Sequence, residues 1–584
     1  MKRPARLVRT IRISLLLTAW CVFPARPQTP VDPGQLPSRT SFYLFWHGAP
    51  SGEIRNNNSL YALWDDPDFA AARSAWLDSF VSEAQSERTA DKPTLSREEF
   101  AQYATLLDNA LLIGSIREPE PLAAKRSTAA PGAKDAPKWD GMFFIYDRSG
   151  KEELLSKAVL RMRGVGADIP KLTSLTVAGI PALKIERKAG VTYWAEFGKN
   201  AVAAKDSSVF EMIIQVVNGK SAESTLAHVP AYLEAKPLLT GGVLEFFVAV
   251  PSLKDLAVDP STKAPPSTKL FLDAIQLDSL HSIAGHVVLQ GAKTHLEGAV
   301  LGDTTAGSLF DIWAEGAATP ASLPYVSPGT IYYGESQFDL PGIYRTLKHA
   351  FVEGPNNSGQ FFTVMESAAQ TRLGMPLGNA LAIPTGEIAW LQDSPTLEDS
   401  QKIYLFGITN KPDALRLTRT LLGDRISSER NEGNTTFLKI SLQGGQSSAG
   451  VAQWNFYHLA VTPSLMFGSF KTEILHNYVN QTATPETPLA KNIVAVRAKY
   501  PPKLNGFSYF DFQKVDWPGL QTGWIEEAKR SVEKAKSHDD AQTAKRLSDW
   551  LAGVNPEVFP RHLHTMAGAS WKDAQGVHFD EWLE

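Results

Sequence analysis

The 584-residue sequence predicts an α+β protein with two related halves. Each half is expected to be a largely antiparallel sheet with helices packed on one face, and a helical C-terminal segment is expected to follow. Three observations predict this fold class: one order of strand and helix patterns occurs twice, short turns join the middle strands, and the apolar spacing alternates between strand and helix periods. With 43% hydrophobic residues, the composition excludes a disordered tail or a collagen-like chain.

The first copy of the pattern opens with Phe143–Tyr146, an apolar run typical of a strand. The segment from Lys151 to Met162 follows, and its apolar residues recur at helical spacing. The second copy opens with Ile403–Phe406 and continues into a helix pattern that starts at Pro412. Proline is favourable there, because the first N–H groups of a helix have no partner within the helix.

The two copies continue in parallel through three short strands and a second helix. The matched strand segments are Leu183-Lys184-Ile185 with Leu438-Lys439-Ile440, Val191 and Trp194 with Val451 and Trp454, and Ala201-Val202 with Ala460-Val461. The matched helix residues are Glu211, Val217 and Asn218 with Glu473, Val479 and Asn480. We therefore predict an internal repeat in which about residues 141–218 recur at about 401–480.

Turn patterns predict how neighbouring strands run. Lys188-Ala189-Gly190 and Gly198-Lys199-Asn200 are too short for a parallel crossover, so they join antiparallel strands. A longer hairpin is expected with strands Ser282–Leu289 and His295–Leu301 and its turn at Gln290-Gly291. Gly506–Phe512 is the expected counterpart of a strand at Leu244–Val250.

The predicted domain boundaries follow from these patterns and from breaks in composition. We expect a signal peptide at 1–25, the first half at 26–317, the second half at 318–515 and a helical segment at 516–584. The boundary between the halves is placed in Ala317-Ala318-Thr319-Pro320.

The first residues are typical of an export signal. Five cations (Lys2, Arg3, Arg6, Arg9 and Arg12) precede the apolar run Ile13–Phe23, which is about half the roughly 20 residues needed to span a bilayer. The sequence therefore predicts a periplasmic or extracellular protein, with membrane contact at most through an uncleaved leader. The only cysteine, Cys21, lies inside this leader, so cleavage after Ala25 leaves a chain without thiols.

Net charge excludes one class of partner. Loss of the five leader cations lowers the formal net charge from −4 to −9. Nucleic acid is not an expected partner, because phosphate contacts need clustered Lys and Arg.

One short segment of the sequence adds a resemblance to other proteins. Together with the leader and the tandem pattern, Pro384-Thr385-Gly386-Glu387-Ile388-Ala389-Trp390 resembles exported bacterial proteins of unknown function that carry a duplicated α+β domain. In such proteins a strand that begins with Gly-Glu precedes the strand–helix unit. The resemblance covers about residues 141–535 and implies an extracytoplasmic location. It carries no catalytic signature, so it implies no functional residue.

Catalytic motifs give no candidate. The nearest approach to Gly-x-Ser-x-Gly is Gly445-Gln446-Ser447-Ser448-Ala449, which lacks the last glycine and falls in an expected loop. No Ser-x-x-Lys occurs together with Ser-Asp-Asn, and the His-Glu-x-x-His and Gly-x-x-x-x-Gly-Lys-Ser/Thr motifs are missing. We therefore predict no catalytic residue and no cofactor.

Two polar clusters are candidates for metal binding. His562 and His564 lie two apart, which in an extended segment points both rings to one side, and His578 follows with Asp580 and Glu581. These groups suit zinc or a similar ion, but a packed or solvated C-terminal segment is the favoured interpretation, because no spacing here is diagnostic of a metal site. A second cluster, Asp65, Asp66 and Asp68, lacks the longer glycine-containing loop that calcium prefers, and Asp66 is expected to cap a helix. A capping box is expected at Ser96 and Glu99.

Aromatic residues have two interpretations. Phe42–His47 is apolar on both faces, which predicts a central strand covered on both sides, while the alternative is an exposed platform for a sugar or peptide. Trp194 and Trp454 are interpreted as packing residues at equivalent positions of the repeat.

The function that these patterns favour is a non-catalytic, exported binding or interaction scaffold. Its ligand would lie in the groove between the halves or on a sheet face, and its partner would be a protein or an envelope component. The alternative is an exported hydrolase that acts on envelope polymers or peptides through carboxylates or a C-terminal metal site. The fold class alone does not distinguish these two.

Overall fold

The computed structural model describes most of the chain after the leader. The described residues are 31–74, 96–117, 141–164, 171–187, 190–219, 224–250, 279–304, 308–352, 359–398, 401–442, 456–480, 488–533 and 538–584. The predicted signal peptide and Trp454 lie outside these residues.

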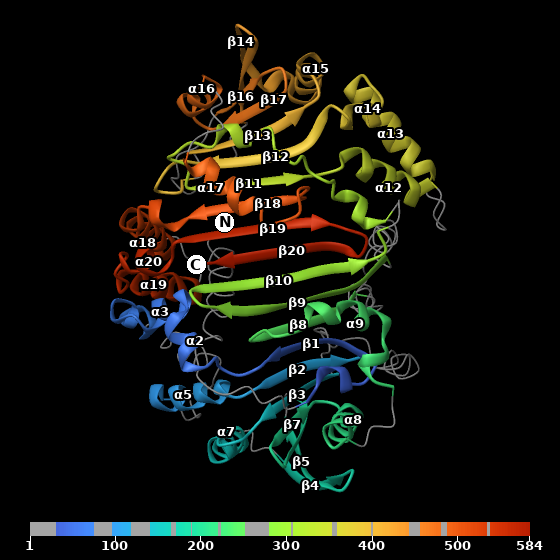
Figure 1. Ribbon diagram of the computed structural model, residues 1–584, viewed down its shortest axis with the longest axis vertical. Helices are drawn as coiled ribbons and strands as arrows, with labels where there is room; N and C mark the ends of the chain where they lie inside the picture. The colour runs from blue at the N-terminus through green and yellow to red at the C-terminus, as the bar shows by residue number, and fades with distance from the viewer. Residues whose placement is uncertain are drawn as a thin grey trace.

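The described strands form one curved sheet of twenty strands, in which every pairing is antiparallel (Figure 1). The first ten, in spatial order from one edge, are β4 (Lys171–Val177), β5 (Ile180–Arg187), β6 (Gly190–Phe197), β7 (Asn200–Ala204), β3 (Met142–Asp147), β2 (Leu111–Ile116), β1 (Thr40–Trp46), β8 (Leu244–Ala249), β9 (Leu280–Gln290) and β10 (Lys293–Gly302). The next ten are β20 (Gly576–Leu583), β19 (Thr565–Lys572), β18 (Gly506–Asp511), β11 (Tyr332–Gln337), β12 (Pro384–Gln392), β13 (Lys402–Ile408), β17 (Leu465–Ser469), β16 (Phe456–Val461), β15 (Thr435–Ser441) and β14 (Ile426–Glu432). The predicted α+β class with a large antiparallel sheet is confirmed.

The order of connections is the same when it is read inward from either edge. The strand β4 corresponds to β14, β3 to β13, β8 to β18, and β10 to β20 at the centre. The register agrees as well, because Leu183 of β5 pairs with Trp194 of β6 and Leu438 of β15 pairs with Leu459 of β16.

This register changes two matches proposed from the sequence. Trp194 corresponds to Leu459 rather than to Trp454. Ala201-Val202 lies in β7, whose counterpart is β17, whereas Ala460-Val461 lies in β16. The second copy has a longer connection between its β15 and β16 strands, so a comparison of residue types alone slips out of register there.

The predicted local elements are mostly present. The strand β1 lies between β2 and β8 and buries Tyr43, Phe45 and Trp46, which agrees with a central strand. The hairpin of β9 and β10 turns at Gly291, whose φ of 58° lies in the left-handed region that glycine adopts freely. Ser96 and Glu99 form the predicted capping box of α5 (Arg97–Ala104).

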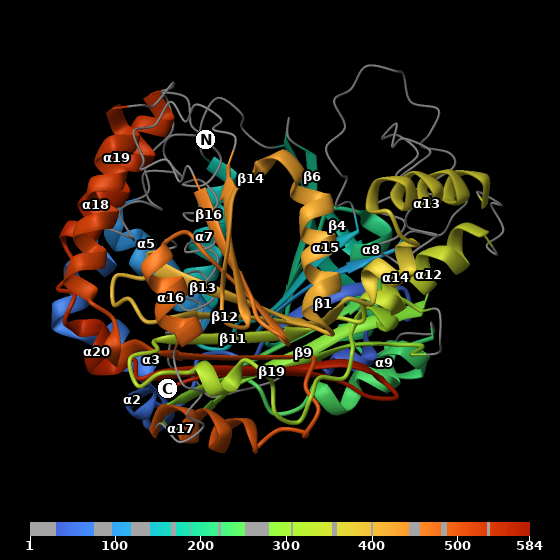
Figure 2. The same ribbon diagram turned by 90° about the horizontal axis from the view of Figure 1, so that it is seen from above.

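Helices cover both faces of the sheet (Figure 2). The outer, convex face carries α8 (Ser207–Val217), α9 (Pro230–Ala235), α16 (Thr472–Asn480) and α17 (Pro488–Arg497), whose apolar side chains join the two largest core clusters. At the two ends of the sheet, α7 (Glu152–Gly164) and α15 (Lys411–Leu422) pack on the inner face. The helices α12 (Leu340–Val352), α13 (Gly359–Leu373) and α14 (Leu377–Leu381) stand beside α15.

The C-terminal segment is helical, as predicted, and it ends in two further strands. The helices α18 (Trp517–Glu533), α19 (His538–Ala552) and α20 (Val558–His562) stand along one end of the strands, where α20 packs against α3 (Ser59–Asp65). The chain then enters the centre of the sheet as β19 and β20. The sequence pattern did not predict these two strands, because polar residues interrupt their apolar residues. Among the described residues, no helix combines the length and the apolar character that crossing a bilayer requires.

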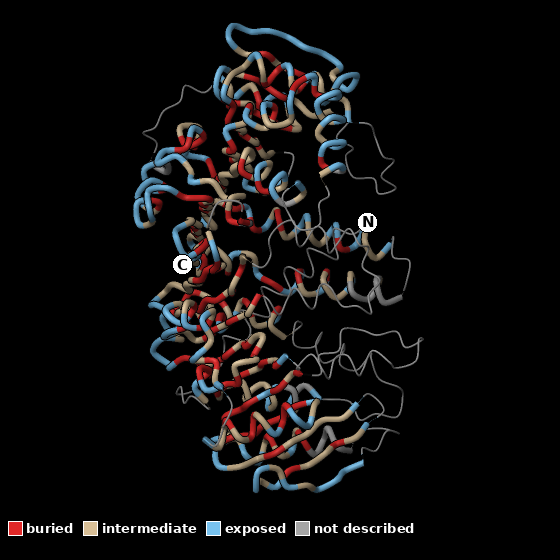
Figure 3. The backbone as a smooth tube through the Cα atoms, turned by 90° about the vertical axis from the view of Figure 1, so that its right-hand side faces the viewer, coloured by how far each residue is buried: buried red, intermediate tan, exposed pale blue. Residues whose placement is uncertain are grey.

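The two edges of the sheet are exposed (Figure 3). Nearly all residues of β4 and β14 are open to solvent. Both edge strands carry charged side chains, which discourage the addition of another chain.

Gly386 and Glu387 hold the connection between β10 and β11 in place. The Glu387 carboxylate accepts hydrogen bonds from the backbone N–H groups of Ala321 (3.2 Å) and Ser322 (2.9 Å). Gly386 has a φ of 89°, and a Cβ there would lie 1.9 Å from the Phe338 carbonyl oxygen. This pair therefore has a structural role in the connection.

Replacement of Gly386 by alanine is expected to lower the free energy of unfolding by about 2 kcal/mol or more, because it adds both left-handed strain and overlap with Phe338. Gly433→Ala is the matched control, since Gly433 also has a positive φ (55°) but open space at its Cβ position. Urea denaturation monitored by circular dichroism measures both. Equal losses in the two variants would contradict the role assigned to the Phe338 contact.

Candidate functional site

The inner face of the sheet centre is apolar and partly open. Directly opposite residues of antiparallel strands share a face, so the ladders assign each side chain to the inner or outer face. Across β1, β8, β9, β10, β20, β19, β18 and β11 the half-buried apolar residues of the inner face are Phe42, Leu44, Phe246, Val248, Ile283, Val287, Leu296, Val300, Phe579, Leu583, Met566, Phe510 and Tyr332. No other surface among the described residues carries so long a row of such side chains across neighbouring strands.

Aromatic rings lie flat on this face because glycine stands beneath them. A Cβ on Gly334 would lie 2.6 Å from the Trp390 indole, and a Cβ on Gly298 would lie 2.5 Å from the Phe579 ring. The Tyr332 ring stacks beside Trp390, with ring centroids 6.2 Å apart. Glycine at these positions therefore lets each ring present a face, rather than an edge, to the interior of the curve.

One row of this face runs from an aromatic ring to a carboxylate. Trp390, Gly334, Ser508, Gly568 and Glu581 are directly opposite one another on β12, β11, β18, β19 and β20. Four strand spacings of about 4.8 Å place the two ends about 19 Å apart. Of the three residues between them, Gly334 lies under the Trp390 ring, whereas Ser508 and Gly568 leave a low floor beside Glu581.

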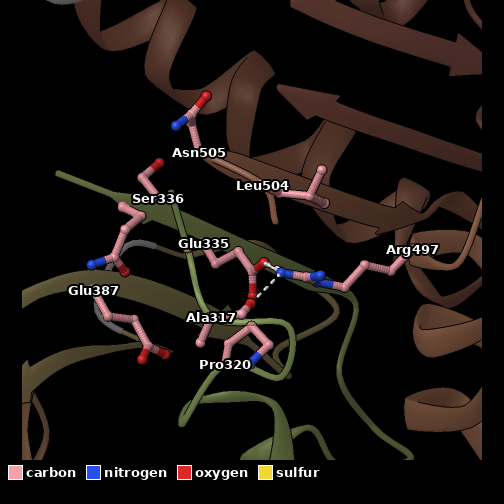
Figure 4. A pocket seen from close by; sticks show the side chains of 10 residues that line it. Ala317, Pro320, Glu335, Ser336, Glu387, Arg497, Leu504 and Asn505 are labelled. Carbon is pink, nitrogen blue, oxygen red and sulfur yellow. Dashed lines mark hydrogen bonds and ion pairs between the residues drawn. The ribbon is translucent and has the colours of Figure 1, made fainter. Parts of the chain in front are cut away.

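The outer face contains a small polar pocket around a buried ion pair (Figure 4). Arg497 of α17 lies 2.9 Å from Glu335 of β11, and only 7% of each side chain is exposed. Tyr333 donates a hydrogen bond to Glu335, and Arg497 also donates to the carbonyl oxygens of Ala317 and Ala318. Burial raises the pKa of Glu335, and Arg497 and Tyr333 partly offset this effect.

The volume of this pocket limits what it can hold. Its cavity volume is about 10 Å³, which is about the space of one water molecule. Glu335, Glu387 and Arg497 are already paired, whereas Asn505 Oδ1 has no partner among the described residues. Two of the carbonyl oxygens that Arg497 binds belong to the predicted boundary between the halves. We therefore interpret the ion pair of Glu335 with Arg497, called the clasp below, as a structural contact that holds this connection against the sheet.

A larger cavity lies at the end of the sheet, on β4, β5 and β6. Its volume is about 500 Å³, and Trp194 lines it with Glu196, Leu183 and Pro181. The Trp194 indole donates to Glu196 (3.0 Å), which also pairs with Arg148. Trp194, interpreted from the sequence as a packing residue, packs against the core cluster of Tyr146, Leu155 and Ala201 and also lines this cavity.

The three candidate metal ligands are not brought together. His562 ends α20 rather than lying in an extended strand, and its Nε2 is 2.7 Å from Asp66. His564 is exposed beside the last residue, Glu584, whereas His578 stacks on Trp571 about 20 Å away along β20. No group of three or more His, Cys, Asp or Glu side chains that could hold a metal ion occurs within the described ranges.

The residues of the predicted acidic cluster take structural contacts. Asp66 accepts from the Asp68 backbone N–H (2.8 Å), as expected for a cap, and also binds Arg561 (2.8 Å). Arg561 pairs with Asp68 as well (2.9 Å). This cluster therefore ties the first part of the chain to α20.

A second group of titratable residues lies at the centre of the outer face. Glu297 of β10 and Asp580 of β20 are directly opposite each other, where like charges repel. His295 Nε2 lies 2.8 Å from Asp580, and Tyr500 donates to the same carboxylate (3.0 Å). The hydrogen bond to Asp580 raises the pKa of His295, although partial burial opposes the shift.

Sequence reasoning missed the row that ends at Glu581 and the ion pair of Glu335 with Arg497. Glu581 was considered only as a companion of the histidines. The alternation of Phe579, Asp580, Glu581 and Trp582 is a strand signal, but it does not state which face is inner.

Comparisons with known proteins assign no family. No family model matches the chain, and no curated protein matches it. Among solved structures, the chain is similar to a Treponema protein of unknown function, reported as "Structure of crystal form I of TP0453". The identity is 12%, the match covers 47% of this chain and 80% of that chain, and the TM-score is 0.18. A likeness of this size carries no argument about the function of this chain.

Replacement of Arg497 by methionine is expected to lower the free energy of unfolding by about 3–5 kcal/mol, because it leaves Glu335 buried without its cation. Adding Glu335→Gln should restore part of this loss. Arg372→Met, on the exposed side of α13, is the control and should change stability by less than about 0.5 kcal/mol. Chemical denaturation measures all three, and an Arg497→Met loss no larger than the control would refute the clasp.

The raised pKa of His295 predicts a pH-dependent stability. Because the folded state holds the proton more tightly, the contribution of the pair with Asp580 is complete below the ordinary histidine pKa of about 6.5 and is lost as the pH rises through the raised value. The difference in melting temperature between wild type and His295→Asn should therefore shrink between pH 6 and pH 9. A difference that is constant over this range would exclude the charged pair.

Proposed function

We propose that this protein is a non-catalytic, exported binding scaffold that holds its ligand on the inner face of the sheet. One observation carries the proposal: thirteen apolar side chains stand half-buried on eight neighbouring strands, on the concave side of the curve. Contiguous apolar surface of this kind marks a binding site, because burial against a ligand recovers about 25 cal/mol for each Å² removed from water.

The polar groups of the described residues support binding rather than catalysis. The strongest pairs (Glu335 with Arg497, Asp66 with His562, and Asp580 with His295) each join segments far apart in the chain. A hydrolase would need acids and bases that converge on an accessible substrate position. The hydrolase alternative therefore has no specific observation in its favour.

Export and duplication are part of the proposal. The cationic and apolar leader supports export, as does the resemblance to exported bacterial proteins with a duplicated α+β domain. The identical strand order from both edges, with matching register, supports duplication of one ten-strand unit. Duplication explains how the apolar face came to be continuous, since the inner faces of two copies meet at β10 and β20.

A neutral apolar dye tests the proposed site. N-phenyl-1-naphthylamine should bind the purified protein saturably, and its fluorescence should rise on binding. Ser508→Trp fills the inner face of β18 and should weaken this binding at least tenfold. Val288→Trp adds the same bulk to the outer face of β9 and should leave it unchanged. Melting temperatures of both variants control for folding.

Equal loss of dye binding in the two variants, or no loss in either, would reject the inner face as the site. If the wild-type protein does not bind the dye saturably, the scaffold proposal itself is rejected.

A further inference from the structure

The inner face offers little to a polar ligand. Its backbone N–H and C=O groups are used by the strand ladders, so a peptide or sugar lying there would lose water without gaining hydrogen bonds. Serine hydroxyls on β18, β19 and β11 are the main neutral polar groups of this face (Ser508, Ser570 and Ser336). The surface therefore favours a ligand that is mostly an apolar chain.

Glu581 is the chemical exception on this face. Among the described inner-face residues of the eight central strands it is the only carboxylate, because Glu245, Glu297, Glu335 and Asp580 all point to the outer face. Its side chain is exposed, and no hydrogen bond or ion pair joins it to another described residue. Its neighbours in the row are Gly568 and Leu296, neither of which can neutralise it.

Cations are scarce on the same surface. Lys572, at the end of β19, is the only lysine or arginine among these inner-face residues. Its ammonium donates to the Phe310 carbonyl oxygen (2.8 Å) and lies 3.7 Å from Asp311. An anionic head group would therefore meet no available positive charge near Glu581, whereas a cationic one would find its counter-charge.

We propose that the inner face binds an amphiphile with one apolar chain and a cationic head group, and that the head group pairs with Glu581 while the chain lies along the row toward Trp390. This inference rests on the proposed function, because it names the ligand class of the same face. The low floor at Gly568 and Ser508 lets a chain lie flat, and the Trp390 ring, which lies over Gly334, closes the far end of the row.

The environment of Glu581 supports this role. Although the residue is open to solvent in part, partial burial of the carboxyl raises its pKa above the ordinary value. The folded state therefore holds the proton more tightly than the unfolded chain, so the ionised carboxylate costs stability at neutral pH. A cation that binds beside it removes part of that cost.

Calorimetric titration with four probes below their micelle concentrations tests the inference. The probes are dodecyltrimethylammonium, dodecyl maltoside, dodecyl sulfate and tetramethylammonium. Dodecyltrimethylammonium is expected to bind at least tenfold more tightly than dodecyl sulfate, and tetramethylammonium should bind far more weakly, because it lacks the chain. Glu581→Gln should weaken dodecyltrimethylammonium at least fivefold and leave dodecyl maltoside unchanged.

Glu297→Gln is the matched control, because Glu297 lies on the neighbouring strand but on the outer face. It should change neither affinity. Affinity for dodecyltrimethylammonium should also fall as the pH falls through the raised pKa of Glu581, while dodecyl maltoside binding stays constant. The melting temperature of Glu581→Gln at neutral pH should equal or exceed that of wild type, which shows that the variant folds.

The outcomes separate the two proposals. If dodecyltrimethylammonium and dodecyl maltoside both bind on the inner face, as judged by loss in Ser508→Trp, but Glu581→Gln changes neither affinity, the head-group assignment is wrong and the scaffold proposal stands. If no dodecyl ligand binds, or if Ser508→Trp leaves their binding intact, the ligand class and the site are both wrong.

Discussion

The ladder between β10 and β20 is the interaction on which the rest of the structure depends. It joins the strand order that runs inward from β4 to the one that runs inward from β14, through eight residue pairs. Its central pair sets two carboxylates, Glu297 and Asp580, directly opposite each other. The repulsion is tolerable because His295 lies against Asp580 and His286 faces Glu297, 4.0 Å away. Without this ladder the chain would form two separate sheets, and neither would carry the whole inner face.

Helices cover the two faces of the joined sheet to different extents. On the outer face, helices α8, α9, α16 and α17 bury aromatic side chains such as Tyr43, Phe247 and Tyr333, and ion pairs join several of the polar groups there. On the inner face, helices cover the two ends of the sheet and leave the middle to half-buried rings. A curved sheet favours this division, because its convex face offers more area for helices than its concave face does. The ligand class then depends on the few polar residues that point inward.

Much of the local structure could be predicted from the sequence. The apolar run Phe143–Tyr146, the hairpin at Gly291 and the capping box at Ser96 each depend on residues close together in the chain, and each is present. The two C-terminal strands were missed, because their charged and aromatic residues alternate in a pattern that a solvated tail shares. The Glu335–Arg497 clasp was missed because its partners are 162 residues apart in sequence. Residue types alone also matched Trp194 to Trp454, since only a strand ladder reveals that Leu459 takes the corresponding position.

Because periodicity and turn chemistry act over a few residues, the sequence was enough to predict the α+β class, the short antiparallel turns and the caps. Tertiary structure alone decided that the last strand pairs with β10, and therefore that Asp580 points outward and Glu581 inward. Neighbouring residues of a strand always point to opposite faces, but which face is enclosed depends on the direction in which the whole sheet curves. That choice makes one of two adjacent carboxylates the only acid that the described residues of the eight central strands place on the inner face.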